Sequence, residues 1–321
     1  MLQFRDAIRY LTLLLGCLGA APTPLWAAVL PLPAHGALVG EFAETTAAQD
    51  DTLIDLARRY GLGYEEVVNA NPGVDPWLPG AGTRIRLPLR RILPEAPREG
   101  IVINLPEHRL YYYPAAKAGE ARVVVTYPVS VGKMDWATPI GVTRIAAKIK
   151  DPTWTPPESV RAEHAARGDI LPRVIPAGPD NPLGLFAMRL AIPGGAYMIH
   201  GTNKPAGVGM QVTHGCMRLY PEHIEELFKM VSVDTPVRIL NQPLKVGWSD
   251  GNLYVEVHPP LEATDSSVVA PDRTALARLV SNAARQQSAV GILWTRAESA
   301  FSDAQGIPVA VNEALPAGGT P

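Results

Sequence analysis

Prolines and glycines interrupt this chain so often that long regular helices have little room to form. The 321 residues include 32 prolines and 28 glycines, with short apolar runs between them. Proline removes a backbone donor and glycine favours turns, so this spacing is typical of strands joined by turns. We therefore expect residues 99–241 to form a mainly β, antiparallel and sandwich-like domain. Its predicted strands are 101–105, 110–113, 122–130, 141–148, 196–200 and 236–240.

Chain length and charge limit the class of protein. A chain of 321 residues is long enough for two domains, and a hydrophobic fraction of 47% is enough for buried cores. The formal net charge is -2, so the protein has no overall positive potential that would attract nucleic acid, and we expect no nucleic-acid partner. The 7 histidines are scattered and have no cysteines at metal-ligand spacing, so we expect no metal site and no cofactor.

The first 27 residues have the pattern of a secretory signal peptide. Arg5 and Arg9 precede an apolar run over residues 10–20, and Ala27 fits the last residue before cleavage. Prolines between residues 22 and 33 shorten the apolar run below the roughly 20 residues needed to span a bilayer. We therefore expect residues 1–27 to direct export rather than to form a membrane anchor.

The two cysteines have different settings. Cys17 lies inside the leader, where the residues 14–17 resemble a lipoprotein cleavage box, so a lipid anchor through Cys17 is the alternative to simple export. Cys216 would then be the lone thiol of the mature chain, which cannot form an internal disulfide. A lone thiol in an oxidising compartment is a candidate nucleophile, although it could also be a buried small hydrophobe.

Residues 40–88 have the pattern of a small α+β module. Asp50 and Asp51 can cap a helix of amphipathic spacing, and Asn71-Pro72-Gly73 stops a second one. The predicted order is strand, helix, helix, strand, with helices at 53–60 and 64–69 and the last strand at 83–87.

Three further segments complete the chain. A proline-broken, charged connector covers residues 89–99. The insert 151–182 contains 7 prolines and is predicted to form a lid or wall over the site, with an inert surface excursion as the alternative. Residues 242–321 are a C-terminal extension that we expect to be partly helical, with a helix at 274–286 and a frayed tail at 314–321.

Catalytic chemistry at Cys216 requires a base, because a thiol attacks an amide carbonyl well only as thiolate. His200 ends an apolar run just before a glycine, and a strand end is a rigid platform for an imidazole. His214 is closer in sequence, but its alignment across Gly215 is difficult, so we favour His200 and keep His214 as the alternative. Gly215 permits a tight turn whose amides could face a developing oxyanion.

A positively charged side chain follows the thiol. Arg218 could bind a carboxylate of a substrate or pair with Glu222 or Glu225. Pro221 suits the first turn of a helix that begins there.

Two parts of the sequence resemble known families. The segment Thr213-His214-Gly215-Cys216-Met217-Arg218, preceded by His200, resembles the signature of the YkuD-type L,D-transpeptidase domain. The flanking blocks 101–113, 152–156, 175–182 and 254–258 are similar to its ErfK/YbiS/YcfS/YnhG branch. Residues 40–88 resemble a LysM module, with Asp51-Thr52-Leu53 and Asn69-Ala70-Asn71-Pro72 at matching positions, although Asp50 stands where glycine is usual.

The resemblance implies a role for several residues. Cys216 matches the nucleophile, His200 the base, and the carbonyl of Gly201 the group that orients the imidazole. Backbone amides around His214 and Gly215 match the oxyanion hole. Further residues expected to contact substrate are Arg218, Thr202, Asn203 and Thr213.

The resemblance also implies a reaction in the periplasm. The enzyme would cleave the bond between meso-diaminopimelate and D-alanine in a peptidoglycan tetrapeptide stem and pass the acyl group to an amine. A lysine of an outer-membrane lipoprotein is the favoured acceptor, and diaminopimelate, which gives 3-3 cross-links, is the alternative. The LysM-like module would bind glycan strands. A non-catalytic wall-binding protein and an unrelated cysteine protease are the competing functions.

Overall fold

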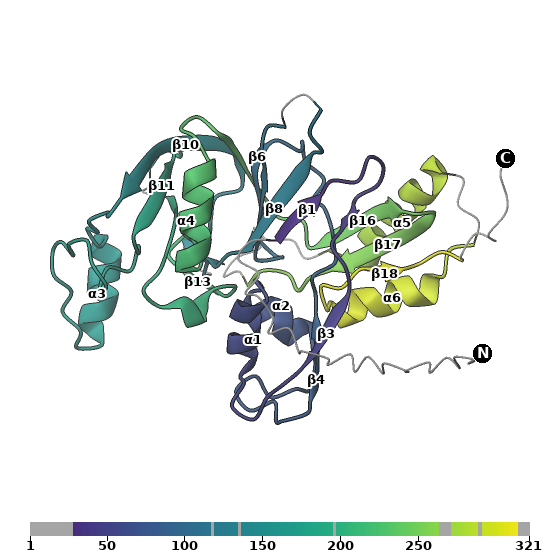
Figure 1. The fold of residues 1–321 in the computed structure, drawn as a ribbon, viewed down its shortest axis with the longest axis horizontal. Coiled ribbons are helices and arrows are strands. Elements are labelled where there is room, and N and C mark those ends of the chain that lie inside the picture. The colour runs from purple at the N-terminus through teal and green to yellow at the C-terminus, as the bar shows by residue number, and fades with distance from the viewer. Residues whose placement is uncertain are drawn as a thin grey trace, which may run out of the picture.

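The computed structural model describes residues 28–116, 119–133, 136–194, 197–262, 271–287 and 291–313. The predicted leader with Cys17 and the predicted tail 314–321 lie outside these ranges. Within them, no helix has the length and apolar character that crossing a bilayer requires. Figure 1 shows one large sheet, a small unit below it that contains α1 and α2, and a third unit around α5 and α6.

The large sheet has nine strands, and the prediction of a mainly β protein is confirmed. Its strands are, in spatial order, β1 (Ala28–Pro31), β8 (Val123–Pro128), β7 (Arg109–Tyr113), β6 (Gly100–Asn104), β15 (Pro236–Leu240), β10 (Gly141–Lys150), β11 (Phe186–Leu190), β12 (Met198–His200) and β14 (Met217–Arg218). The expected antiparallel pairing is wrong at two places, because β6 pairs with β15 and β12 pairs with β14 in parallel. In each case the connecting chain returns to the starting end of the sheet, as parallel neighbours require.

Helix α4 (Pro221–Met230) covers the sheet near β11 (Figure 1). Pro221 occupies its first turn as expected, and Ile224 and Leu227 are buried. These side chains join the largest apolar cluster, which also contains Ile199 and Met217 from the strands that lead to the candidate site. The core therefore fixes β12 and β14 from one face.

The segment after the predicted leader is part of the sheet. Strand β1 pairs antiparallel with β8, with Val29 opposite Val125. Its short length and Pro31 suit an edge position, where one side of a strand needs no backbone partners.

The predicted order of the small module is confirmed. It consists of β3 (Ala43–Thr46), α1 (Leu53–Arg59), α2 (Tyr64–Ala70) and β4 (Arg84–Leu87), with β3 and β4 antiparallel. The expected cap of α1 is wrong. Thr52 caps the helix and exchanges hydrogen bonds with Asp55, whereas Asp51 pairs with Arg59 at 2.6 Å. A threonine hydroxyl and a carboxylate three residues later form a capping box.

The C-terminal extension is more than a helical tail. The predicted helix is present as α5 (Arg273–Gln286), and α6 (Trp294–Asp303) follows it. Both pack on a three-stranded sheet of β16 (Leu244–Ser249), β17 (Asn252–Val257) and β18 (Val309–Ala310). Asp250 and Gly251 both have positive φ, so they join β16 to β17 in the geometry of a tight hairpin. The connector 89–99 also contains a strand, β5 (Arg91–Ile92), which pairs with β2 (Leu38–Val39).

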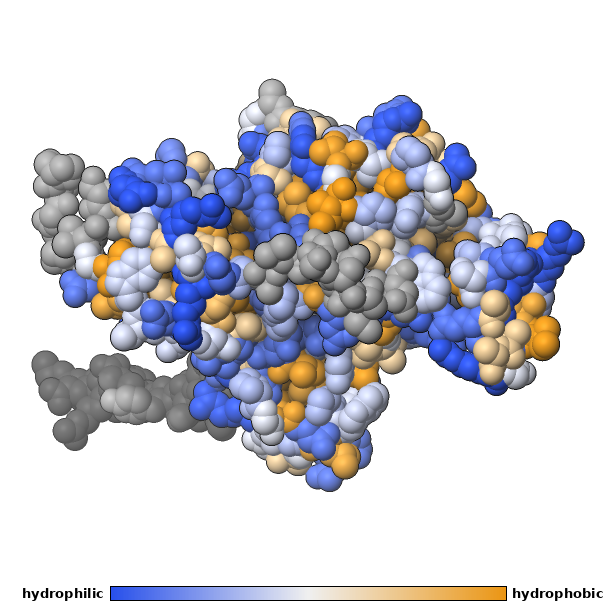
Figure 2. Space-filling model, turned by 180° about the vertical axis from the view of Figure 1, so that it is seen from behind, coloured by the Kyte–Doolittle hydropathy of each residue, from blue (hydrophilic) through white to orange (hydrophobic). Residues whose placement is uncertain are grey.

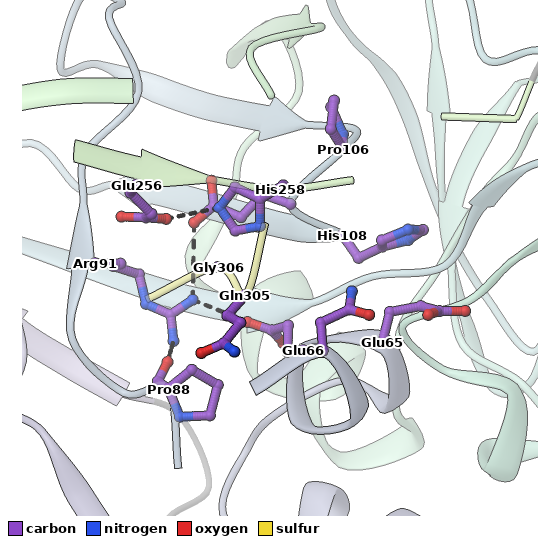
Figure 3. Close-up of a pocket in the computed structure, with 12 residues that line it drawn as sticks. Glu65, Glu66, Pro88, Arg91, Pro106, His108, Glu256, His258, Gln305 and Gly306 are labelled. Atoms are coloured by element: carbon purple, nitrogen blue, oxygen red, sulfur yellow. Dashed lines mark hydrogen bonds and ion pairs between the residues drawn. The ribbon is translucent and has the colours of Figure 1, made fainter. Parts of the chain in front are cut away.

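Buried ion pairs join the small module to the large sheet and to β5, and Figure 3 shows Glu66 beside Arg91. Glu66 on α2 accepts hydrogen bonds from Arg109 on β7 at 2.6 and 2.8 Å and from Arg91 on β5 at 3.0 Å. All three side chains are almost fully buried. Because the arginines stay next to the carboxylate, the pKa of Glu66 lies below its ordinary value, although burial by itself would raise it.

Candidate active site

Strand pairing brings Cys216, His200 and Arg218 to one face of the sheet. In the parallel pair of β12 and β14, Ile199 lies opposite Met217 and His200 opposite Arg218. Successive side chains of a strand alternate between its faces. Ile199 and Met217 are both in the apolar core. Their sequence neighbours His200, Cys216 and Arg218 therefore point to the other face.

The imidazole of His200 has a defined orientation. Its Nδ1 lies 2.7 Å from the carbonyl oxygen of Gly201. A carbonyl can only accept, so Nδ1 carries the proton, and the neutral ring has its lone pair on Nε2. The Gly201 carbonyl therefore orients the imidazole, and Nε2 is the ring nitrogen without a proton.

Burial sets the resting protonation of this pair. It lowers the pKa of His200 to about 3, helped by the charge of Arg218 and opposed by the carbonyls of Gly201 and Leu183. Burial also raises the pKa of the Cys216 thiol, against the opposing effects of the Met198 amide and Arg218. Both shifts favour the uncharged form of each side chain, so a resting thiolate is disfavoured. A neutral thiol and a neutral imidazole are present at neutral pH.

The turn before the thiol depends on glycine. Gly215 has a φ of +92°, and a Cβ at this position would lie 2.8 Å from Cε1 of Tyr197. The Thr213 hydroxyl donates to the carbonyl of Cys216 at 2.6 Å. This turn carries the backbone amides that the sequence suggested for an oxyanion hole.

The ring of His214 is directed to the insert. Its Nε2 lies 2.9 Å from the carboxylate of Glu163 on α3 (Glu158–Ala166), and its ring packs against Trp136 with centroids 4.5 Å apart. Glu163 also pairs with Lys133 at 3.1 Å. His214 is thus engaged by a carboxylate, which disfavours it as the base, and the insert contacts the loop that carries the thiol, as a wall or lid would.

Two of the predicted substrate-binding side chains are buried and form hydrogen bonds with the protein backbone. Thr202 is buried, and its hydroxyl accepts from the amide of Lys204 at 2.9 Å. Thr213 is buried as well and holds the Cys216 carbonyl. Their side chains therefore support loops rather than face a ligand, whereas Asn203 is exposed.

Arg218 is not paired with either acidic residue that the sequence offered. Glu222 forms a bidentate pair with Arg58 of α1 at 2.8 and 2.9 Å, and Glu225 pairs with Lys229 at 2.7 Å. Among the described residues, no carboxylate lies in ion-pair distance of Arg218, and its buried Nε has no hydrogen-bond partner. Burial lowers the pKa of Arg218. A partly buried guanidinium of this kind is suited to an anionic ligand.

Sequence reasoning missed two residues next to the site, Glu163 and Thr138. Thr138 is buried and donates to the carbonyl of Gly215 at 3.1 Å. Both lie at least fifty residues before the thiol, and no local spacing connects them with it.

A cluster outside this site has the residue types of a metal site. The ligand atoms of Glu107, Glu256 and His258 lie within 4.8 Å of one another. The ammonium group of Lys245 lies 2.9 Å from Glu107 and 2.7 Å from Glu256, so it supplies the positive charge between the two carboxylates. The negative charge of this cluster is therefore balanced by protein groups. The cluster lies beside α2 of the small module, next to Arg91 (Figure 3).

Comparisons with known proteins show which family the sequence resembles. Residues 98–239 match the model of the YkuD L,D-transpeptidase catalytic domain. The chain is 45% identical over 247 residues to the Escherichia coli K12 protein named "Probable L,D-transpeptidase YcfS", covering 75% of this chain and 76% of the relative. It is 43% identical to "Probable L,D-transpeptidase YbiS" of the same strain, covering 75% and 78%. The solved catalytic domain of the Enterococcus faecium L,D-transpeptidase is 24% identical, with a TM-score of 0.32 over 46% of this chain and 100% of that domain.

Proposed function

Because the chain belongs to the YkuD family of L,D-transpeptidases, we propose that Cys216 is its nucleophile and His200 its general base in peptidoglycan transpeptidation. The orientation of His200 carries this proposal. Its bond to the Gly201 carbonyl at 2.7 Å leaves Nε2 as the basic nitrogen on the face where the thiol stands. The low pKa of His200 keeps that nitrogen free of a proton until attack.

In the first half-reaction, the thiol proton of Cys216 passes to Nε2 of His200 as the sulfur attacks the carbonyl carbon between diaminopimelate and D-alanine. The oxyanion that forms is stabilised by backbone amides of the turn at Gly215. The carbon–nitrogen bond then breaks, the imidazolium returns its proton to the leaving amine, and D-alanine departs. The acyl group remains on sulfur as a thioester.

In the second half-reaction, an acceptor amine attacks the thioester carbonyl and gives its proton to His200. The carbon–sulfur bond breaks, and the sulfur of Cys216 recovers a proton. The net result is a new amide in place of the old one, so the energy of the cleaved bond is retained and no nucleotide is needed.

The donor stem carries carboxylates that fit Arg218. This guanidinium is partly buried and has no acidic partner among the described side chains, so a bound carboxylate would restore the charge balance that burial removes. The site would thereby select a stem peptide over a neutral amide.

A lysine side chain of an outer-membrane lipoprotein is the acceptor that we propose, on the basis of the flanking blocks that resemble the ErfK/YbiS/YcfS/YnhG branch. Purified enzyme should be given a tetrapeptide donor together with equal amounts of a lysine peptide and a diaminopimelate stem. A preference for the diaminopimelate amine would replace this assignment with 3-3 cross-linking.

The module at residues 40–88 is proposed to be a LysM module that binds glycan. The exposed side chains of Trp77 and Leu78 support this role, because an aromatic ring can stack on a sugar. Both amides donate to the carboxylate of Asp75, at 2.8 and 3.1 Å, which fixes the turn that presents them. Figure 2 shows apolar surface on this module, below the sheet. With the predicted leader, the module supports a periplasmic location at the wall.

Substitution of the thiol tests the mechanism directly. We expect C216A to abolish D-alanine release from a tetrapeptide and to leave the far-UV circular dichroism spectrum unchanged. Wild-type enzyme mixed with donor should gain the mass of the acyl group at Cys216, seen by intact-protein mass spectrometry. Wild type that gives neither acyl-enzyme nor product would instead be a wall-binding protein, and cleavage of casein would indicate a cysteine protease.

A further inference from the structure

Residues 130–133 and 136–138 support the nucleophile turn from a neighbouring part of the chain. The amide of Ser130 donates to the carbonyl of Arg218 at 2.9 Å, and the amide of Lys133 donates to the carbonyl of Thr213 at 2.9 Å. These bonds flank the thiol on both sides along the chain. The turn is therefore held by neighbouring residues as well as by the bond that Thr213 makes within it.

Among these supporting residues, the Thr138 hydroxyl makes two hydrogen bonds. It accepts from the amide of Gly132 at 3.1 Å and donates to the carbonyl of Gly215 at 3.1 Å. Thr138 is 5% exposed, so water cannot easily replace it. The hydroxyl has one proton, and its use as donor to Gly215 is fixed because the Gly132 amide can only donate.

The bond to Gly215 fixes the direction of the next amide. In a trans peptide unit, the carbonyl of Gly215 and the N–H of Cys216 point in opposite directions. When Thr138 holds the carbonyl, the Cys216 N–H points out of the opposite edge of the same peptide unit. Gly215 has no Cβ to resist rotation, so the orientation of this plane depends on its hydrogen bonds.

We propose that Thr138 is a positioning residue that aligns the Cys216 amide with the oxyanion of the acyl-transfer step. This inference rests on the proposed cysteine mechanism. The Thr213 hydroxyl bonds the carbonyl on the other side of Cys216 at 2.6 Å. Together the two threonines hold both peptide units that flank the nucleophile, one on each side.

The test compares T138V, which keeps the side-chain shape but has no hydroxyl, with T138S, which keeps the hydroxyl. Loss of one oxyanion-hole donor lowers kcat by about 10²- to 10³-fold, so we expect T138V to lose this much acylation rate with little change in KM. T138S should stay within about threefold of wild type, since its hydroxyl can make the same two bonds.

Alkylation of Cys216 by iodoacetamide is the second measurement. It displaces iodide at a saturated carbon and forms no oxyanion, so it reports the thiol alone. We expect T138V to be alkylated at the wild-type rate while its acylation by tetrapeptide donor is slow. The alkylation endpoint also counts the accessible thiol, so acylation rates can be expressed per titrated thiol. T138A, which cannot overpack the site, serves in the same way should T138V fold poorly.

Two results would overturn the inference: acylation by T138V at the wild-type rate, or alkylation slowed as much as acylation. The second would make Thr138 a residue that places the sulfur or supports the fold. The proposed function has its own separate readout, because an inactive wild type or an active C216A would contradict the cysteine mechanism whatever Thr138 does.

Discussion

Replacement of Glu66 by glutamine should strongly destabilise the contact between the small module and the sheet. Glutamine keeps the shape of the side chain but removes its charge, which leaves Arg109 buried without the carboxylate it pairs with and Arg91 with Glu107 at 3.9 Å. Removal of one partner from a buried ion pair costs about 3–5 kcal/mol, because the remaining charge stays desolvated. We expect E66Q to lower the free energy of unfolding by this amount.

A second ion pair between the same two units provides a matched control. Glu222 on α4 pairs with Arg58 on α1 at 2.8 Å, but the two side chains are 24% and 45% exposed. Exposed pairs contribute about 0–1 kcal/mol, so E222Q should have little effect. The comparison separates burial from the mere presence of an ion pair.

Urea unfolding followed by tryptophan fluorescence and far-UV circular dichroism measures both variants. Addition of about 0.5 M NaCl should reduce the small effect of E222Q and leave that of E66Q, since salt screens exposed charges more than buried ones. The double variant E66Q/R109M should cost less than the sum of its parts, because methionine removes the unpaired charge. Equal costs for E66Q and E222Q, within about 1 kcal/mol, would refute the reasoning.

Three other substitutions or conditions test the site. G215A should destabilise the protein by about 1–3 kcal/mol and reduce acylation, because its Cβ meets Tyr197 and its φ is positive. Thermal unfolding and D-alanine release measure this, and G207A, whose added Cβ would meet only Val212 Cγ2 at 3.9 Å, should be neutral. R218M should raise KM for a tetrapeptide by about 10- to 100-fold, as expected for a lost charged hydrogen bond, while an unchanged KM would exclude carboxylate binding there. The folded pKa of His200, about 3 against 6.5 for the free side chain, means that the folded state binds fewer protons between these values. Stability should therefore fall as pH drops from about 6.5 towards 3, and less so in H200Q; identical pH profiles by urea titration would contradict this.

Much of the architecture could be predicted from local patterns. Proline and glycine spacing located β6, β7, β8 and β15 to within about two residues, because each is a short apolar run between turn residues. The module order followed from helical spacing and from the stop at residues 71–73. Strand β11 was missed since its buried residues, 187, 188 and 190, do not alternate. The hairpin at Asp250-Gly251 was also missed, although its Asp-Gly turn is a recognised signal.

The candidate site could be predicted only as far as its residues lie close in sequence. Cys216 and His200 stood out by type and setting, and Gly201 followed from the resemblance. Thr138 and Glu163 reach the same turn from distant segments, and a single sequence does not contain that proximity. The resting protonation of the pair could not be predicted, because the degree of burial, which raises one pKa and lowers the other, depends on packing.

The position of β1 determines whether the sheet has a protected border. This strand spans the 4 residues Ala28–Pro31 and pairs with β8 along one side of the sheet. A chain that lost these residues would leave the backbone of β8 open to pairing with another chain. The first described strand therefore protects the sheet from self-association.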